Sequence, residues 1–304
     1  MSRRPARRRR SPGASPAILR HAFERYFARA LPPARTTPPR LHQAMRYGAL
    51  SPGKRLRPLL VLAACDAVGG DWRRALPAAA AVECAHAFSL IHDDLPAMDD
   101  DDFRRGRPTT HRRYGEALGI LAGDALLARA FEELARLAER GVPAARAARA
   151  VRWLAAACGS RELVGGQALD LAAEGRRTDG LAVRDIHRRK TGALIACSLQ
   201  LGALVGGAGA ARVGELGALG RRLGLAFQIH DDLLNRGSSL RRLGKRAGTD
   251  AARRKATYPR AVGEQRARLE AERLYAGVAR RIRGLGPRAA ALGEVVLAAA
   301  ERVR

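Results

Sequence analysis

Apolar residues recur at helical spacing along most of the chain, and this pattern predicts an all-α protein. The predicted helical segments are 41–49, 56–69, 75–95, 115–139, 143–171, 181–206, 210–235, 258–283 and 286–303. Clusters of Gly, Pro or Asp separate them, and the alternating pattern of β-strands is scarce. We therefore expect a single bundle of about ten helices that encloses a central cavity.

The first 40 residues do not continue this pattern. They contain eleven Arg and a single acidic residue, Glu24, in a segment that also holds Pro and Ser. Such a composition predicts a disordered Arg-rich tail over 1–40, ahead of one all-helical domain over 41–304. A transit peptide and a nucleic-acid-binding arm are alternatives, although no apolar signal core follows the arginines.

A stretch of twenty residues, 192–211, carries no charge and has the length that a membrane span needs. It contains Ser198, Gln200 and five glycines, and ordinary amphipathic sequence flanks it. We therefore interpret it as a buried core helix that ends in the glycine-rich loop 206–209, and we expect no transmembrane segment.

The formal net charge is +27, and 47% of the 304 residues are hydrophobic, which excludes a chain that is disordered throughout. Of the 56 cationic residues only four are Lys, namely Lys54, Lys190, Lys245 and Lys255. The four cysteines stand far apart, with no spacing typical of a zinc site or a disulfide framework. We therefore expect a reducing, cytoplasmic environment.

The densest group of acidic residues lies at 93–102, where six of the 29 acidic residues fall within ten positions. The apolar run before it places Asp93 and Asp94 at the end of a buried helix. Pro96 cannot continue regular helical hydrogen bonding, so we expect the chain to bulge there and to turn Asp99 back toward Asp93. Hard oxygen ligands in such a cluster suit Mg²⁺. Taken alone, the cluster would be better interpreted as a solvated acidic loop.

A second acidic pair, Asp231 and Asp232, also follows an apolar helical run. Asn235 lies four positions after Asp231, so the two share one face of a helix. Two acidic pairs that face each other across a bundle would hold a polyanion through bridging magnesium ions, and this arrangement suits a diphosphate. Lys54 agrees with this reading, because it lies in a basic turn at a predicted helix start, where backbone N–H groups and cations favour phosphate.

Seven blocks of sequence, in order over roughly residues 41 to 260, resemble the trans-polyprenyl diphosphate synthase family, most closely the bacterial farnesyl diphosphate synthases. The blocks are 53–58 (GKRLRP), 92–106 (HDDLPAMDDDDFRRG), 165–170 (GGQALD), 190–194 (KTGAL), 227–232 (FQIHDD), 243–246 (LGKR) and 257–259 (TYP). The resemblance implies the all-α isoprenoid synthase fold and a homodimer. It also implies that isopentenyl diphosphate condenses with dimethylallyl or geranyl diphosphate by ionisation, condensation and elimination.

The resemblance assigns roles to the matching residues. It implies three Mg²⁺ ions, with metal ligation or its close support by Asp93, Asp94, Asp99 and Asp231. The allylic diphosphate would be held by Arg104, Lys190 and Lys245. The residues implied at the reacting end, and so in catalysis, are Lys190, Thr191 and Gln228. Isopentenyl diphosphate would be bound by Lys54, Arg57, His86 and Arg105. Without these neighbouring motifs, His86 would be interpreted as a core histidine.

Phe88 precedes Asp93 by five residues, which is about 7.5 Å along a helix. A ring there would form a floor below the first acidic pair. In the family, an aromatic residue at this position together with the longer first acidic motif goes with a C15 product, so we expect farnesyl diphosphate. Geranylgeranyl diphosphate is the alternative if the small Ser89 opens a bypass. Phe88 could also be an ordinary core residue.

Asn235 stands where the family usually has Asp, and the loop 236–242 departs from the usual acidic sequence. These departures leave open a catalytically weakened homologue or a regulatory subunit. A nucleic-acid-binding helical protein is a further alternative, based on the Arg excess, but we expect no nucleic-acid partner. A terpene cyclase would share the first acidic run, whereas Asp231 and Asp232 argue against it.

Overall fold

The computed structural model describes residues 13–237 and 255–300. The α-helices are α1 (Pro16–Ala30), α2 (Pro39–Ala49), α3 (Leu56–Ala67), α4 (Leu76–Asp93), α5 (Thr110–Tyr114), α6 (Glu116–Ala135), α7 (Ala144–Cys158), α8 (Leu163–Ala173), α9 (Gly180–His187), α10 (Ala193–Val205), α11 (Ala210–Gly237), α14 (Tyr258–Val262), α15 (Glu264–Arg283) and α16 (Ala290–Ala300). Shorter helical turns are η1 (Trp72–Ala75), η2 (Arg188–Gly192) and η3 (Pro287–Ala289), and β1 (Phe103–Arg104) pairs antiparallel with β2 (Arg107–Pro108). The predicted all-α class is confirmed.

Two of the predicted helical segments are interrupted, and a third changes its helical type along its length. The segment 143–171 divides into α7 and α8, because Gly159 adopts an extended conformation with ψ of −175°. The segment 258–283 divides into α14 and α15 at Gly263, whose φ of +91° a helix does not allow. The segment 181–206 stays helical, but it passes through the wider π-helical turn η2 between α9 and α10.

The prediction of a disordered tail as far as residue 40 is wrong for residues 16–30, which form α1. Ser15 caps this helix, and its apolar residues Leu19, Phe23 and Phe27 are fully buried, with the two Phe rings stacked 5.2 Å apart. These residues follow a four-residue spacing, which the surrounding arginines obscure in a count of composition. Burial of this apolar face attaches α1 to the bundle. Residues 1–12 lie outside the described part of the chain.

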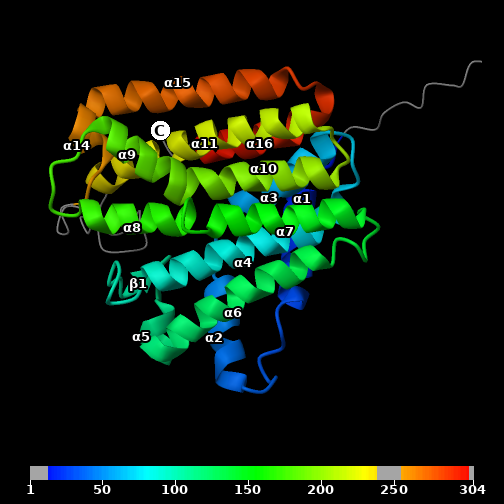
Figure 1. Cartoon of the computed structure of the whole chain (residues 1–304), viewed down its shortest axis with the longest axis horizontal. Helices are drawn as coiled ribbons and strands as arrows, with labels where there is room; N and C mark the ends of the chain where they lie inside the picture. The colour runs from blue at the N-terminus through cyan, green and yellow to red at the C-terminus, as the bar shows by residue number, and fades with distance from the viewer. Residues whose placement is uncertain (1–12, 238–254, 301–304) are drawn as a thin grey trace, which may run out of the picture.

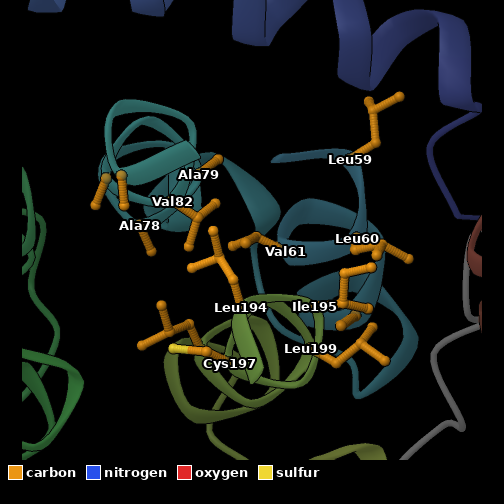
Figure 2. Close-up of a cluster of buried hydrophobic side chains, with 14 of the residues drawn as sticks. Leu59, Leu60, Val61, Ala78, Ala79, Val82, Leu194, Ile195, Cys197 and Leu199 are labelled. Atoms are coloured by element: carbon orange, nitrogen blue, oxygen red, sulfur yellow. The ribbon is translucent and has the colours of Figure 1, made fainter. Parts of the chain in front are cut away.

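The core lies where α3, α4 and α10 meet. Figure 2 shows Val61 from α3, Val82 from α4 and Leu194 from α10 pointing toward one another. Every residue of α10 except Gln200 is buried, so the interpretation of 192–211 as a core helix is confirmed. Among the described residues one stretch, Trp72–Asp93, is long and apolar enough to cross a membrane, but 72% of its most apolar window is buried inside the bundle.

The helices are arranged so that several of them end at the same side of the molecule (Figure 1). α3 and α10 occupy the middle, α11 and α15 lie on one side of them, and α4 and α6 lie on the other. The carboxyl ends of α4 and α11 reach the end of the bundle where β1, α8, α9 and α14 also lie (Figure 1). The first acidic run begins at the end of α4, and Asp231 and Asp232 lie in the last two turns of α11, so the fold brings the two runs to the same end of the bundle.

Candidate active site

A cavity of about 780 Å³ opens among these elements. Its acidic lining residues are Asp93 and Asp99 from the first acidic run, Asp231 and Asp232 from the second, and Asp170 from α8. Its cationic lining residues are Arg57, Arg104, Arg105, Lys190 and Lys255, and its apolar lining residues include Phe88, Leu163, Leu171 and Phe227. The predicted cavity is therefore present, with residues of both acidic runs and an apolar part around one space.

The first acidic run turns back on itself, as Pro96 predicts. The backbone N–H of Asp99 donates a hydrogen bond to the carbonyl oxygen of Asp93 at 2.7 Å, and Asp100 adopts a left-handed conformation with φ of +49°. The turn places both Asp93 and Asp99 on the cavity wall. Burial raises the pKa of Asp93, and the nearby carboxylate of Asp99 raises it further, whereas Lys190 opposes both. Two carboxylates held this close in a buried site attract a cation.

Asp94 is not among the residues that line the cavity, and its implied part in metal binding, as a ligand or as a close support of the ligands, stays a prediction. Its side chain is buried, and one carboxylate oxygen accepts hydrogen bonds from Arg104, with Nε and Nη2 both 2.6 Å away. Burial acts to lower the pKa of Arg104, but the carboxylate of Asp94 raises it above its ordinary value. Asp94 therefore fixes the guanidinium of Arg104 at the cavity wall.

The two carboxylates of the second acidic run have different surroundings. Asp231 and Asn235 line the cavity. Asp232 is 4% exposed and accepts hydrogen bonds from the backbone N–H of Tyr258 at 2.8 Å and from Nε2 of Gln228 at 3.3 Å. Its other neighbour is Nε2 of His187, 2.9 Å from the same oxygen that Tyr258 contacts. The hydrogen bonds of Asp232 thus connect α11 to α9 and α14. Asp231 is the member of the pair that we assign to metal binding at the cavity.

Thr191 and Gln228 form one hydrogen-bonded unit at the cavity wall. The Thr191 hydroxyl donates to Oε1 of Gln228 at 2.8 Å, and Gln228 continues to Asp232. Both residues line the cavity, as the resemblance implies. The chain of bonds fixes which way the Gln228 amide points, since its nitrogen must donate to the carboxylate and its oxygen must accept from the hydroxyl.

Lys190 projects from the π-helical turn η2, which two glycines allow to pack between neighbouring helices. A Cβ atom on Gly166 of α8 would collide with the backbone nitrogen of Lys190, and one on Gly224 of α11 would collide with Gly192. The Lys190 ammonium donates to Asp170 Oδ2 at 2.8 Å. Although burial acts to lower it, the pKa of Lys190 is raised by Asp93 and Asp170. π-helical turns of this kind are frequent at functional sites.

Arg57, His86 and Arg105 form a cationic group at the cavity. Arg57 Nη1 lies 3.1 Å from His86 Nε2, and because arginine has only donors, the histidine nitrogen accepts and the ring is neutral. Burial and then Arg57 lower the pKa of His86 well below its ordinary value. Burial also lowers the pKa of Arg57 to about 10, and its Nε has no hydrogen-bond partner among the described residues. Two guanidinium charges and an unused N–H donor at one place in the cavity favour the binding of an anion.

One of the predicted cationic binding residues, Lys54, does not line this cavity. Its side chain is exposed. Its neighbour Arg55 is buried instead and pairs with Glu24 at 2.9 Å and Glu83 at 2.7 Å, so it joins α1 and α4 to the start of α3. Lys245 lies outside the described residues, and its predicted role stays a prediction.

Phe88 lines the cavity beside Ser89, as the floor hypothesis requires. The ring is 7% exposed and meets the His92 ring edge-on, with centroids 4.9 Å apart. This contact comes from one turn further along α4 and fixes the plane of the Phe88 ring. The cavity wall at Phe88 is therefore aromatic, and the small side chain of Ser89 lies next to it.

Sequence reasoning assigned no role to two residues that line the cavity, Lys255 and Gln167. The Lys255 ammonium lies 2.7 Å from Asp99 Oδ1, and both side chains are largely buried. Lysine is rare in this sequence, with four residues among 56 cations, so Lys255 could have been singled out from the sequence as a candidate site residue. Gln167 lies in α8 within the block 165–170, and only the structure shows that this residue forms part of the cavity wall.

The donor set fits magnesium. Asp93, Asp99 and Asp231 offer hard carboxylate oxygens on walls of the same cavity. In the described part of the chain no three His, Cys, Asp or Glu side chains lie close enough to form a metal site by themselves. Magnesium commonly takes one or two carboxylates and completes its coordination with water and phosphate oxygens, so a site shared with a diphosphate suits this arrangement.

Comparisons with known proteins agree with this geometry. The polyprenyl synthetase family profile matches residues 38–282. The chain is 48% identical over 238 residues to a chloroplastic geranylgeranyl pyrophosphate synthase of Catharanthus roseus, and 47% identical over 241 residues to the heterodimeric geranylgeranyl pyrophosphate synthase large subunit 1 of Arabidopsis thaliana. Each match covers 78% of this chain but 66% and 65% of the two relatives, so the chain spans slightly less than two thirds of their length.

Solved structures match along nearly the whole chain. An FPP/GFPP synthase from Zymomonas mobilis is 36% identical with a TM-score of 0.82, over 93% of this chain and 96% of that one. A geranyltransferase from Helicobacter pylori, complexed with magnesium and isoprenyl diphosphate, is 29% identical with a TM-score of 0.83, over 97% of this chain and 99% of that one.

Proposed function

The chain belongs to the polyprenyl synthetase family, and from this premise we propose that it is a trans-prenyltransferase. Its substrates are isopentenyl diphosphate and an allylic diphosphate, and its product is an allylic diphosphate five carbons longer. The observation that carries the proposal is that one cavity holds Asp93 and Asp231, from runs 138 positions apart, together with an apolar wall. Magnesium would neutralise the diphosphate and assist its departure, and Asp93, Asp99 and Asp231 would hold it.

Two different sets of residues hold the two diphosphates. Arg104, fixed by Asp94, and Lys190, fixed by Asp170, hold the allylic diphosphate and stabilise the charge that it gains as the allylic C–O bond breaks. Arg57, His86 and Arg105 hold the diphosphate of isopentenyl diphosphate, which does not react. Its double bond attacks the allylic cation, and a proton is then lost to the departed diphosphate.

The cavity also protects the allylic cation from water. Thr191 and Gln228 place oxygen dipoles beside the reacting carbon, because their hydrogen bonds fix their orientation. Phe88, Leu163, Leu171 and Phe227 surround the hydrocarbon chain and exclude water, which would capture the cation. Ionisation is thus restricted to the acidic end of the cavity and chain growth to its apolar part.

We propose farnesyl diphosphate as the main product. The Phe88 ring stands in the cavity wall and limits the length available to the growing chain. Geranylgeranyl diphosphate is the second candidate, for which two observations speak: Ser89 beside the ring leaves room, and the plant relatives at 48% and 47% identity are named geranylgeranyl pyrophosphate synthases.

We further propose a homodimer. The α6 side chains Ile120 and Leu121 are about half exposed, and a second copy of the chain would cover them.

Asn235 lines the cavity near Asp231 and offers a neutral oxygen where the family has a carboxylate, so a weakened or regulatory subunit is the alternative to a fully active enzyme. The four cysteines are free and buried, consistent with a reducing compartment.

The test is a product assay with the purified full-length chain. Magnesium, labelled isopentenyl diphosphate and dimethylallyl, geranyl or farnesyl diphosphate are incubated, and the dephosphorylated products are sized by chromatography. We expect label in C15 alcohol from the first two starters and none when magnesium is chelated. Label in C20 alcohol would select the second candidate product. No incorporation from any starter would contradict the proposed function.

A further inference from the structure

The β1–β2 hairpin carries two arginines of the cavity wall, Arg104 and Arg105. It is very short, with two paired residues on each strand. A two-stranded hairpin of this kind has little stability of its own. The position of both arginines therefore depends on what the rest of the molecule does to hold the hairpin.

The sequence of the hairpin makes its conformation costly. The strand register places Arg104 directly opposite Arg107, and like charges in that relation destabilise a β-pair. Arg105 and Gly106 form the turn between them, with φ of +54° and +74°. Turns with two positive φ values favour Asn-Gly, because a side chain larger than that of glycine is strained in the left-handed region. A strained arginine at the turn persists only where surrounding contacts enforce it.

Tyr47 of α2 supplies contacts to both residues of β2. Its hydroxyl donates a hydrogen bond to the carbonyl oxygen of Pro108 at 2.7 Å. The Cζ atom of Arg107 lies 4.4 Å from the centroid of its ring, a cation–π distance. The ring thus offers the Arg107 guanidinium a favourable contact that offsets the like charge opposite it.

The Tyr47 ring is itself fixed by α5. The Tyr114 ring meets it edge-on with centroids 5.6 Å apart, and the guanidinium of Arg113 lies 4.6 Å from its centroid. Tyr47 is not among the residues that line the cavity. Any effect of Tyr47 on a bound substrate is therefore transmitted through the hairpin.

We propose that Tyr47 is a positioning residue for isopentenyl diphosphate, acting through Arg105, and this rests on the proposed function. By holding β2, Tyr47 keeps the strained turn, and with it Arg105, at the cavity wall. There Arg105 Nη1 also donates to the carbonyl oxygen of Pro52 at 2.8 Å, a bond that a displaced turn would lose. Arg104 has a separate support in Asp94, so the allylic side of the cavity depends less on Tyr47.

The experiment is steady-state kinetics of the full-length chain with Mg²⁺, isopentenyl diphosphate and geranyl diphosphate, each substrate varied in turn. Tyr47→Phe removes only the hydroxyl, and Tyr47→Leu also removes the aromatic ring. Tyr114→Phe is the matched control, because it makes the same change on the ring packed against Tyr47, and its hydroxyl donates to no residue of the hairpin. The melting temperature of each protein is measured in parallel.

We expect Tyr47→Phe to raise the KM for isopentenyl diphosphate about fivefold, the loss typical of one hydrogen bond, and Tyr47→Leu to raise it further. The KM for geranyl diphosphate and kcat should stay unchanged in Tyr47→Phe, because uniform binding of one substrate is what is lost. Tyr114→Phe should match the wild type in all three constants.

An unchanged KM for isopentenyl diphosphate in Tyr47→Phe would overturn the inference. So would a rise of both KM values with a fall in kcat and in melting temperature, since that pattern would assign Tyr47 a structural role alone. Tyr47→Phe keeps the ring and decides the question even where Tyr47→Leu does not fold. A wild-type chain without turnover would instead contradict the proposed function.

Discussion

Lys255 Nζ lies 2.7 Å from Asp99 Oδ1, although 156 positions separate the two residues in the chain. The pair joins the first acidic run to the segment that leads into α14, at the mouth of the cavity. The two side chains are 12% and 11% exposed, so water screens this ion pair only weakly. Asp99 is also a proposed magnesium ligand. The lysine therefore occupies a carboxylate that the metal would use.

The Lys255–Asp99 ion pair should give a stabilising coupling free energy between the two residues, and ligand binding should reduce it. Lys255→Met should destabilise the free chain by about 1 to 3 kcal/mol, because it removes a charged hydrogen-bond partner from the largely buried carboxylate of Asp99. The double variant with Asp99→Asn should lose less than the sum of the two single variants. Urea unfolding of the four proteins measures the coupling. It should shrink in the presence of Mg²⁺ and pyrophosphate, and additive losses in the free proteins would contradict the ion pair.

We expect Arg55 to have a structural role, although it lies in the same sequence block as Lys54 and Arg57, which the resemblance assigns to binding. Arg55→Met removes the partner of Glu83, which is buried, and should lower the free energy of unfolding by about 3 to 5 kcal/mol. Arg73→Met is the matched control, because its contact with Asp71 is exposed and should contribute about 0 to 1 kcal/mol. Equal losses in the two variants, measured by urea unfolding, would show that Arg55 does not hold the helices together.

His86 predicts a pH dependence of stability. Its pKa is low in the folded chain because of burial and Arg57, whereas an unfolded histidine titrates near 6.5. Below that pH the unfolded state binds a proton that the folded state does not, so stability falls by up to about 1.4 kcal/mol for each pH unit until the folded pKa is reached.

The matching measurement compares the wild type with His86→Gln, whose amide oxygen can still accept from Arg57. Urea unfolding at pH 7 and at pH 5 should show a wild-type stability that falls by about 2 kcal/mol more than that of the variant. An equal fall in the two proteins would mean that His86 is protonated in the folded state, contrary to the orientation of its bond with Arg57.

Phe88 predicts the length of the product. Phe88→Ala removes the ring from the cavity wall and should lengthen the main product by at least one five-carbon unit, as measured by chromatography of the dephosphorylated alcohols. Ser89→Phe is the matched change in the opposite direction, and it should shorten the product or block elongation. An unchanged product from Phe88→Ala would show that another part of the cavity sets the length.

Much of this site could be predicted from the sequence, because the signals are local. Pro96 predicted the reversal that joins Asp99 to Asp93, and the block at 190–194 identified Lys190 and Thr191. The helical spacing of the apolar residues likewise predicted the helix bundle. Misassignments arose where neighbouring residues of one block point in opposite directions. Lys54 and Arg55 differ by one position, and a left-handed Arg55 with φ of +50° begins α3, which sends one cation to solvent and the other into the core.

The remaining features depend on contacts between distant segments, which no local pattern contains. Asp94 and Asp93 are chemically identical, and only the position of the β1–β2 hairpin decides that Asp94 pairs with Arg104. Gln167 lies in a recognised block, but only the packed structure shows that its side-chain amide has no hydrogen-bond partner in the described part of the chain. The helix α1 was obscured because its apolar stripe is narrow and arginines surround it.

The central claim is that the two acidic runs form one metal–diphosphate site across the cavity. The most direct measurement is a crystal structure of the full-length chain with Mn²⁺ and pyrophosphate, in which anomalous scattering locates the ions. The account predicts pyrophosphate inside the cavity, with ions in coordinating contact with Asp93 and Asp99 on one side and with Asp231 on the other. Ions and pyrophosphate bound elsewhere, with Asp93 and Asp231 left unliganded, would contradict it.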